Sequence, residues 1–368
     1  MRSLMKTTST LMVAAAAAVS FSYATPAQAV DFSGKKVTLI VPFGEGGATD
    51  TVARLLQPYL QEALPGKPTV IVLNQPGGGS IKGANKFEAS APNDGTALIF
   101  TSTSTVLPFT LGAENVKFDP TGWEGVMGMP RGAVVYTNAE QTGVTGYGKD
   151  PKGDVEAMKK AKVVNGAKTP ISSELLDTVA MDLLGVDMNP VFGISTGKQR
   201  GVFQRGETNL NVDGTGAYLT KMAKSTEGAK ATPLFTYGYM QADGTIGRDP
   251  DMMDLPSYPE FYKAVTGKDL AGIERQVFLN LFANKVTLSK AVFLPAGTPK
   301  DIQAAYVDTF KKIYADPELR KLLEAKVGAM NPNFGEETNV QVREGLKMGA
   351  EARAWLDKFV QRKFNVSL

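Results

Sequence analysis

Residues 36–50 read KVTLIVPFGEGGATD, in which an apolar run leads into a glycine-rich loop and the loop opens a helix. Residues 37–41 are apolar without alternation and mostly β-branched, which is typical of a strand covered on both faces in the parallel sheet of an α/β domain. Pro42 ends that strand. The three glycines of the loop lack a Cβ atom, so the backbone there can approach a ligand closely.

The segment after these glycines predicts a helix, with Thr49 or Asp50 as the side chain that caps its N-terminus. Its apolar residues recur at helical spacing, at Val52, Leu55, Leu56, Tyr59, Leu60 and Leu64. A strand, a bare-backbone loop and a helix start direct free N–H groups and the positive end of the helix dipole to one point, which favours an anion. Open α/β sheets also bind ligands beyond the carboxyl ends of their strands.

A second copy of this arrangement follows within a short distance. Residues 69–73 predict a strand, residues 74–79 (NQPGGG) a loop, and Ser80 a cap for the next helix. Two such loops from neighbouring strands would hold one ligand between them. For either loop alone, a tight turn without ligand contact explains the glycines as well.

Residues 96–101, TALIFT, predict a third strand. In a parallel sheet it would bring Thr101, Ser102, Thr103 and Ser104 to the edge where the two glycine loops lie. Hydroxyl groups there can donate to a carboxylate without adding charge. Capping of a helix or turn is an equally good explanation for any one of them.

These residues also carry a family resemblance. The stretches PFGEGGATD and NQPGGGSIKGANKFEASAPNDGTALIFTSTST, with LPSYPEF and AVFLPAGTPKDIQAAYVDTFKKIYADPELRKLLE later in the chain, resemble the solute-binding proteins of tripartite tricarboxylate transporters, the Bug family. The resemblance runs from about Lys35 to the C-terminus and is strongest at both ends. It implies a periplasmic-binding-protein fold of type II, with two α/β domains that close on a carboxylate. It also implies a monomer that works with membrane permease subunits.

The resemblance divides the chain into two domains joined by a two-strand hinge. Domain 1 is expected to be discontinuous, formed by residues 30–130 and 291–368, and domain 2 by residues 131–290. Each is expected to hold a mostly parallel sheet flanked by helices. The last helix is expected to run without a break over residues 336–364, because apolar residues recur there among many charges.

Residues 1–29 have the layout of a secretory signal peptide. Arg2 and Lys6 precede an apolar stretch at residues 11–21, and Ala27-Gln28-Ala29 provides a small-residue cleavage site. No cysteine follows for a lipid anchor. The sequence therefore predicts cleavage after the signal and a periplasmic location.

Composition excludes several classes of chemistry. The chain has no histidine and no cysteine, which removes Ser-His-Asp and Cys-His sites, disulfides and nearly all zinc sites. Loss of the signal removes two positive charges, so the formal net charge falls from +3 to +1. This balance argues against a nucleic-acid partner. No metal or cofactor is expected, and no GxxxxGK[ST] phosphate motif is present.

The second domain is expected to supply the other half of the site. The resemblance implies that the loop containing Ala167, Lys168 and Thr169 faces the first domain and contacts the far end of the ligand. Lys168 changes the small-residue pattern usual there. Asp213 is either a ligand contact or the N-cap of a following helix. Arg131, at the crossing between domains, and Lys168 are either cations that favour a doubly charged acid or ordinary surface cations.

The sequence thus predicts a binding protein that captures a small carboxylate, which the loops do not narrow beyond a dicarboxylate, tricarboxylate, amino acid or aromatic acid. An enzyme on the same fold, acting on a carboxylate or nucleotide, is the alternative. Asp50 is expected to hold the first loop in shape. The predicted site residues are Phe43, Gly44, Gly46, Gly47, Ala48, Thr49, Asp50, Asn74, Gly77, Gly78, Gly79, Ser80, Thr101, Ser102, Thr103, Arg131, Ala167, Lys168, Thr169 and Asp213.

Overall fold

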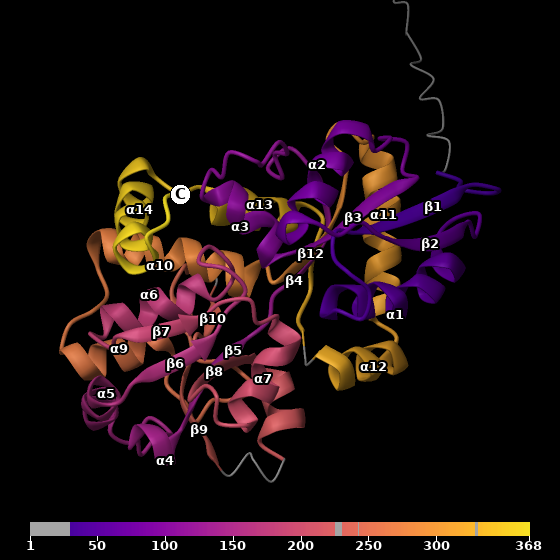
Figure 1. Ribbon diagram of the computed structural model, residues 1–368. Helices are drawn as coiled ribbons and strands as arrows, with labels where there is room; N and C mark the ends of the chain where they lie inside the picture. Colours follow the sequence, from indigo (N-terminus) through magenta and orange to yellow (C-terminus); the bar gives the residue numbers. More distant parts are fainter. Residues whose placement is uncertain (1–29, 225–229, 242, 328–329) are drawn as a thin grey trace, which may run out of the picture.

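The computed structural model describes residues 30–224, 230–241, 243–327 and 330–368. The predicted signal peptide, residues 1–29, lies outside the described residues. The described chain forms two lobes, each built around its own sheet (Figure 1). We call the group around the six-stranded sheet the first lobe and the group around the three-stranded sheet the second lobe.

The six-stranded sheet of the first lobe has the order β13-β4-β12-β3-β1-β2. Its strands are β1 (Lys36–Val41), β2 (Thr69–Asn74), β3 (Ala97–Ser102), β4 (Glu124–Met129), β12 (Lys290–Leu294) and β13 (Asn333–Phe334). β1 is parallel to β2 and β3, whereas β12 is antiparallel to both β3 and β4. β4 therefore runs in the direction of β1, β2 and β3, whereas β12 and β13 run against it. The α/β class is confirmed, but the sheet is mixed rather than mostly parallel in its pairings.

Helices cover both faces of this sheet. They are α1 (Ala48–Ala63), α2 (Ile81–Ser90), α3 (Thr103–Thr110), α11 (Lys300–Tyr314), α12 (Pro317–Val327) and α13 (Glu336–Leu346), with a short η1 (Gly78–Ser80) before α2. Along β3, Phe100 packs on the face covered by α1 and α11, and Ile99 packs on the opposite face with Phe87 of α2. Both faces are apolar, so the unbroken apolar pattern of these strands has its expected cause.

The second lobe differs from the expected mostly parallel sheet. Its strands are β5 (Ala133–Asn138), β6 (Val163–Gly166), β7 (Met188–Val191), β8 (Leu210–Gly214), β9 (Ala231–Thr236), β10 (Tyr239–Met240) and β11 (Ile246–Gly247). β6 and β7 are parallel, but β5 lies between β8 and β9 and is antiparallel to both. β5 enters directly from β4 and occupies the centre, so the later strands align against it.

The helices of the second lobe enclose the largest apolar cluster of the described residues. They are α4 (Ala139–Thr142), α5 (Pro151–Lys160), α6 (Leu175–Leu183), α7 (Thr196–Gln204), α8 (Thr215–Ala217), η2 (Tyr218–Met222), α9 (Tyr258–Thr266), α10 (Gly272–Phe282) and η4 (Ala283–Thr287). Leu107 and Leu111, from α3 and its end, join this cluster. The two lobes therefore share apolar packing as well as chain connections.

The chain passes between the lobes at residues 130–132 and again between η4 and β12. A third passage lies at residues 347–349, because the predicted helix 336–364 is two helices, α13 and α14 (Ala350–Phe364). α14 lies beside α10 (Figure 1) and buries Leu356 and Phe359 in the cluster of the second lobe. The break allows each helix to cover a different core. The domain ranges stay a prediction, and α14 packs outside the domain that they give it.

Candidate ligand-binding site

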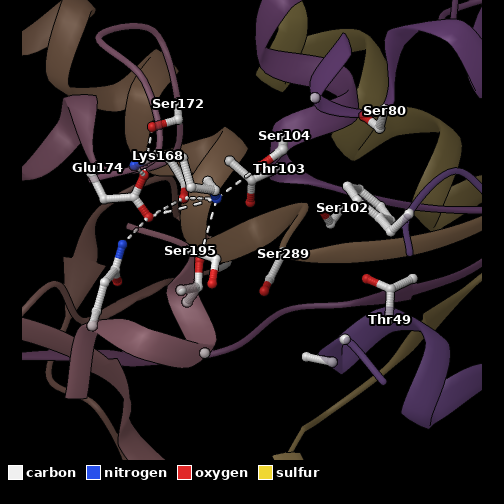
Figure 2. Close-up of a pocket in the computed structure, with 18 of the residues that line it drawn as sticks. Thr49, Ser80, Ser102, Thr103, Ser104, Lys168, Ser172, Glu174, Ser195 and Ser289 are labelled. Carbon is white, nitrogen blue, oxygen red and sulfur yellow. Dashed lines mark hydrogen bonds and ion pairs between the residues drawn. The ribbon is translucent and has the colours of Figure 1, made fainter. Parts of the chain in front are cut away.

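Three loops of the first lobe meet at one edge of its sheet. Because β1, β2 and β3 are parallel, the loops that follow them leave from the same side. Across from them lie the β6–α6 loop, the start of α7 and the end of β8 from the second lobe. The pocket between these segments has a volume of about 1020 Å³. Figure 2 shows hydroxyl groups from both sides directed toward it.

The first glycine loop is held in shape by the carboxylate of Asp50. Its oxygens accept hydrogen bonds from the Gly46 N–H at 2.8 Å, Asn74 Nδ2 at 2.9 Å and Arg54 Nε at 3.0 Å. Burial raises the pKa of Asp50, but these bonds outweigh burial and bring the pKa below its usual value. Asn74 also donates to the Phe43 carbonyl at 3.0 Å. Asp50 and Asn74 thus support the loop from behind, as expected for Asp50.

The helix after this loop begins differently from the prediction. Its N-cap is Gly47, in an extended conformation, and neither Thr49 nor Asp50 occupies that position. Among the described residues no acceptor takes the N–H groups of Gly47, Ala48 or Thr49. They are the orphan donors of a helix start. The Gly46 N–H, by contrast, is already bonded to Asp50 and is not free for a ligand.

The second glycine loop has four consecutive residues with positive φ, from Gly77 at 136° to Ser80 at 98°. That conformation favours glycine, and Ser80 is strained there. Ser80 is the N-cap residue of α2 but its hydroxyl donates to Thr105 Oγ1 at 3.1 Å instead of capping the helix. Its N–H donates to the Gly77 carbonyl at 3.1 Å. The N–H groups of Gly77 and Gly78 have no acceptor in the described chain.

The hydroxyl groups after β3 are mostly engaged. Thr101 donates to the Ala291 carbonyl at 3.1 Å within the sheet, and Thr103 donates to the Asn284 carbonyl at 2.8 Å. Thr101 is buried and lies outside the pocket lining, so the structure gives no support to its prediction as a ligand contact. Ser102 and Ser104 do line the pocket. Ser104 lies opposite Lys168, whose Nζ donates to it at 3.0 Å.

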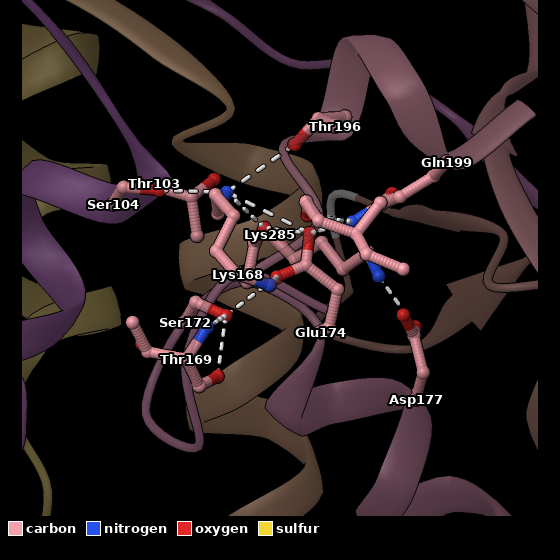
Figure 3. A network of polar contacts seen from close by, with 12 residues as sticks. Thr103, Ser104, Lys168, Thr169, Ser172, Glu174, Asp177, Thr196, Gln199 and Lys285 are labelled. Atoms are coloured by element: carbon pink, nitrogen blue, oxygen red, sulfur yellow. Dashed lines mark hydrogen bonds and ion pairs between the residues drawn. The ribbon is translucent and has the colours of Figure 1, made fainter. Parts of the chain in front are cut away.

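The opposite wall carries a network centred on Lys168 and Glu174 (Figure 3). Lys168 Nζ donates to Ser104 and Ser173 at 3.0 Å each and lies 3.6 Å from Glu174 Oε1. Burial raises the pKa of Glu174, but the charges of Lys168 and Lys285 outweigh burial and bring the pKa down to about 2. Lys285 is itself paired with the buried Asp177. Lys168 and Lys285 of this wall are therefore each paired with a carboxylate.

The carboxylate of Asp213 is also paired with a cation, Arg200. Arg200 donates to both of its oxygens, at 3.0 and 2.7 Å, and the Tyr136 hydroxyl donates at 2.8 Å. The helix that follows has Gly214 as its N-cap, so the N-cap alternative for Asp213 is wrong. Asp213 lines the pocket, but as the partner of Arg200. A bidentate pair of this kind leaves little charge for a ligand.

Two cations of the pocket that are not exposed have no carboxylate within 4.0 Å among the described residues: Arg131 and Lys290. The exposed lysines of the lining form no such pair with the described residues either: Lys198, Lys221 and Lys326. Arg131 Nε is buried without a hydrogen-bond partner. Lys290 is 5% exposed, and its Nζ lies 3.5 Å from Thr49 Oγ1. Burial, and then the charges of Arg131 and Lys168, lower the pKa of Lys290 to about 7. Sequence reasoning did not find Lys290, which is the first residue of an apolar strand.

The structure places most of the predicted site residues on the pocket lining. These are Phe43, Gly44, Gly46, Gly47, Ala48, Thr49, Gly77, Gly78, Gly79, Ser80, Ser102, Thr103, Arg131, Lys168, Thr169 and Asp213. Asp50, Asn74, Thr101 and Ala167 lie outside it. Ala167 is 1% exposed and its N–H donates to the Val191 carbonyl at 2.9 Å, so it positions the loop that carries Lys168. Which of the lining residues touch a ligand stays a prediction.

No metal centre or membrane span emerges from the described chain. Within it, no group of three or more aspartates and glutamates has the arrangement to hold a metal ion. No helix in the same residues is long and apolar enough to cross a membrane.

The fold is that of periplasmic binding proteins. The chain superposes on the structure of the periplasmic binding protein BugD with a TM-score of 0.61 and 20% identity, covering 88% of this chain and 97% of that one. It superposes on a Rhodopseudomonas palustris protein bound to adipate with a TM-score of 0.59 and 20% identity, covering 90% and 98%. For MatC from the same organism with bound malate, the TM-score is 0.56 with 18% identity, covering 88% and 98%.

Sequence comparison supports the resemblance to the Bug family over part of the chain. Protein BugT of Bordetella pertussis is 39% identical over 84 residues, which is 23% of this chain and 25% of BugT. A protein of the tcbD-tcbE intergenic region of a Pseudomonas strain is 37% identical over 84 residues, covering 23% and 24%. The match thus spans about a quarter of the length of these relatives. No family model matches the chain.

Proposed function

We propose that the protein captures a small carboxylate in the pocket between its two lobes and delivers it to the permease of a tripartite tricarboxylate-type transporter. The observation that carries the proposal is the meeting of unsatisfied backbone N–H groups and unmatched cations at one pocket. Gly47, Ala48 and Thr49 provide donors at the start of α1. Arg131 and Lys290 add positive charge that the described protein does not neutralise.

The chemistry of such a pocket selects an anion. Hydrogen bonds to a charged group contribute roughly 1.5–3 kcal/mol each. Four or five of them support micromolar capture once the entropy of association is subtracted. Adipate and malate, which occupy two proteins of the same fold, are both dicarboxylates. We extend this to the present chain as a proposal, with the two lobes acting as the domains that close on the acid.

The remaining parts of the proposal follow from the same comparison. The relatives are binding proteins, and we propose that this protein likewise binds without turnover and works as a periplasmic monomer after removal of residues 1–29. An enzyme on the same fold is the alternative. Lys290 is the observation that favours it, because a lysine with a pKa of about 7 is a nucleophile at neutral pH. Incubation with candidate acids and detection of a product would support the enzyme.

A thermal-shift screen of the purified mature protein tests the proposed function. Mono-, di- and tricarboxylates, amino acids and aromatic acids are compared with their neutral amides at equal ionic strength. A bound acid raises the unfolding temperature because it stabilises the folded protein, and the gain grows with the logarithm of its concentration once that exceeds the dissociation constant. We expect at least one carboxylate to do so while its amide does not. Equal behaviour of every acid and its amide would remove carboxylate capture as the function.

A further inference from the structure

Lys290 occupies an unusual place for a lysine. It is the first residue of β12 and pairs with Ser102 of β3 and Met129 of β4. Because β12 runs against both neighbours, its first residue lies at their carboxyl edge, where the ligand loops emerge. The side chain is buried and lines the pocket. Among the described residues its side chain forms one hydrogen bond, a long one of 3.5 Å from Nζ to Thr49 Oγ1 at the start of α1.

An ammonium group has three donors, and at 3.5 Å the bond to Thr49 is weak. The charged groups that face Lys290 are themselves positive: Arg131 on the β4–β5 connection and Lys168 on the β6–α6 loop. The nearest carboxylate of α1, Asp50, is bonded to Gly46, Arg54 and Asn74. Glu45 in the first loop is exposed and lies 3.9 Å from Arg54. None of the described carboxylates forms an ion pair with Lys290.

The N-terminus of the 16-residue helix α1 adds to this positive field. Burying a cation without a partner is costly, and the cost is avoided by neutralising it. Burial and the neighbouring cations accordingly lower the pKa of Lys290 to about 7. A bound anion would reverse both effects, because it supplies the missing counter-charge. The same anion would be within reach of the unpartnered Arg131 Nε.

We propose that Lys290 is the residue that recognises the charge of the bound anion, and that it takes up a proton from solvent as the anion enters. The step balances: a neutral amine and a proton become an ammonium, which pairs with the incoming carboxylate. The inference rests on the proposed function for the kind of anion, but not for the role of Lys290. Proton uptake by Lys290 makes anion binding tighter at lower pH, whereas the glycine loops alone would give no such pH dependence.

Calorimetric titration of the mature protein with malate and with adipate tests this at pH 6, 7 and 8. Buffers of different ionisation enthalpy count the protons exchanged. Lys290 is mostly neutral at pH 8 before binding, so we expect uptake of nearly one proton per anion there and almost none at pH 6. Affinity should fall roughly ten-fold for each pH unit above about 7. Binding at pH 8 without proton uptake would overturn the proposal.

Two substitutions separate charge from shape. Lys290→Met should weaken binding by ten-fold or more at pH 7 and abolish both proton uptake and its pH dependence. Lys290→Arg keeps a charge at every pH, so it should bind the anion with no proton uptake. Lys152→Met is the control, because Lys152 is an exposed lysine of α5 outside the pocket lining. Wild-type affinity and proton count in Lys290→Met would refute the role of Lys290.

A third arm distinguishes failure of this inference from failure of the proposed function. Sulfate carries negative charge without being a carboxylate. If no carboxylate binds the wild type but sulfate raises its unfolding temperature and does so less in Lys290→Met, carboxylate capture fails and the anion site at Lys290 stands. If carboxylates bind wild type and Lys290→Met alike, capture stands and the inference fails. Without ligand at pH 6, where Lys290 is mostly charged, Lys290→Met should unfold at a higher temperature than wild type, since it removes a buried charge.

Discussion

The two walls of the pocket differ in the groups that they offer to an anion. The wall from the first lobe carries few charges and presents backbone N–H groups at Gly47, Ala48 and Thr49 that have no acceptor in the described protein. The wall from the second lobe is rich in charge, but Lys168 faces Glu174 and Arg200 faces Asp213. The cations of the more charged wall that are not exposed are thus paired, and its unpaired lysines, Lys198 and Lys221, are exposed to solvent, which screens their charge.

The difference shows that the number of charges near a pocket is a poor guide to what it binds. A cation paired with a carboxylate already uses its hydrogen-bond donors, so they are not free for a ligand. Breaking a buried pair to free them is costly. Neutral N–H groups at a helix start carry partial positive charge without needing a counter-ion. Arg131 and Lys290, the unpaired cations of the lining that are not exposed, lie between the walls, where the chain crosses from lobe to lobe.

The largest loss of binding is expected when the backbone donors of the first-lobe wall are blocked. Gly47 has an extended conformation, and a Cβ atom added there meets nothing closer than 3.5 Å. Gly47→Val should therefore fold normally but place a side chain over the donors of the first loop. Loss of two hydrogen bonds of roughly 1.5–3 kcal/mol each would weaken binding by about 100-fold or more. Calorimetric titration with the best acid from the screen measures the effect.

Gly349→Val is the matched control for this prediction. Gly349 is also an extended glycine at the N-cap of a helix, with open space around its Cα, but it lies before α14 and outside the pocket lining. It reports the stability cost of valine at such a position. If both variants bind as tightly as wild type, the first loop does not contact the ligand. The equivalent change at Gly78 is less informative, because its φ of 56° strains any side chain.

Removing the support behind the same wall should have a smaller effect. Asp50→Ala loses the carboxylate that accepts from Gly46, Asn74 and Arg54. We expect a fall of about 1–3 kcal/mol in the free energy of unfolding and roughly ten-fold weaker binding, because the loop loses its fixed shape. The Arg54 bond adds little, since Arg54 is half exposed and its charge is screened. Chemical denaturation and titration measure the two effects.

The pH dependence of this effect has a definite sign. The pKa of Asp50 in the folded protein is lowered from 3.8, so its stabilisation is complete above about pH 3.8 and is lost as the pH falls through the lowered value. The advantage of wild type over Asp50→Ala should be constant from pH 5 to 8 and shrink below pH 3.8. Asp50→Asn tests the charge alone. Much tighter binding by that variant would mean that Asp50 repels the ligand instead of supporting the loop.

Much of the first lobe could be predicted from the sequence because its signals are local. A strand such as residues 37–41 and the glycine loop after it are contiguous, and parallel pairing then brings successive loops to one edge. Which acceptor each donor bonds to could not be predicted from the neighbouring sequence. The Gly46 N–H is taken by a side chain four residues away, and the Thr101 hydroxyl by a carbonyl 190 residues away. Such contacts are set by packing, which single residues do not reveal.

Lys290 was missed for the same reason. In the sequence it begins a strand that returns the chain to the first lobe, and its role depends on Thr49, which is 241 residues away. The sheet of the second lobe was mispredicted because strand direction depends on the order in which strands join β5. The one local signal for Lys290 is a charged residue directly before the apolar run 291–294, which ordinarily means only a strand end.

The smallest expected effect concerns the contact that joins the two walls. Lys168 Nζ of the β6–α6 loop donates to Ser104 Oγ of α3 at 3.0 Å, the only side-chain bond of Lys168 to the first lobe among the described residues. If closure of the lobes forms this bond, Ser104→Ala makes the closed state less favourable and weakens binding. Lys168 keeps Ser173, Thr196 and Glu174 as partners after this change. We therefore expect a loss of only roughly 0.5–1.5 kcal/mol, below the usual value for a bond to a charged group, or about two- to ten-fold in affinity.

The Ser104→Ala experiment distinguishes a bond that holds the closed state from one that merely stabilises the fold. The substitution leaves Lys168 next to Ser173 and Glu174, so the charge of the second wall is unchanged. We expect weaker binding of the same acid with an unfolding temperature, measured without ligand, that stays at the wild-type value. Ser90→Ala, which removes an exposed hydroxyl bonded within its own helix, is the control. A lower unfolding temperature with unchanged affinity would show that the Lys168–Ser104 bond persists without ligand and that the walls do not separate there.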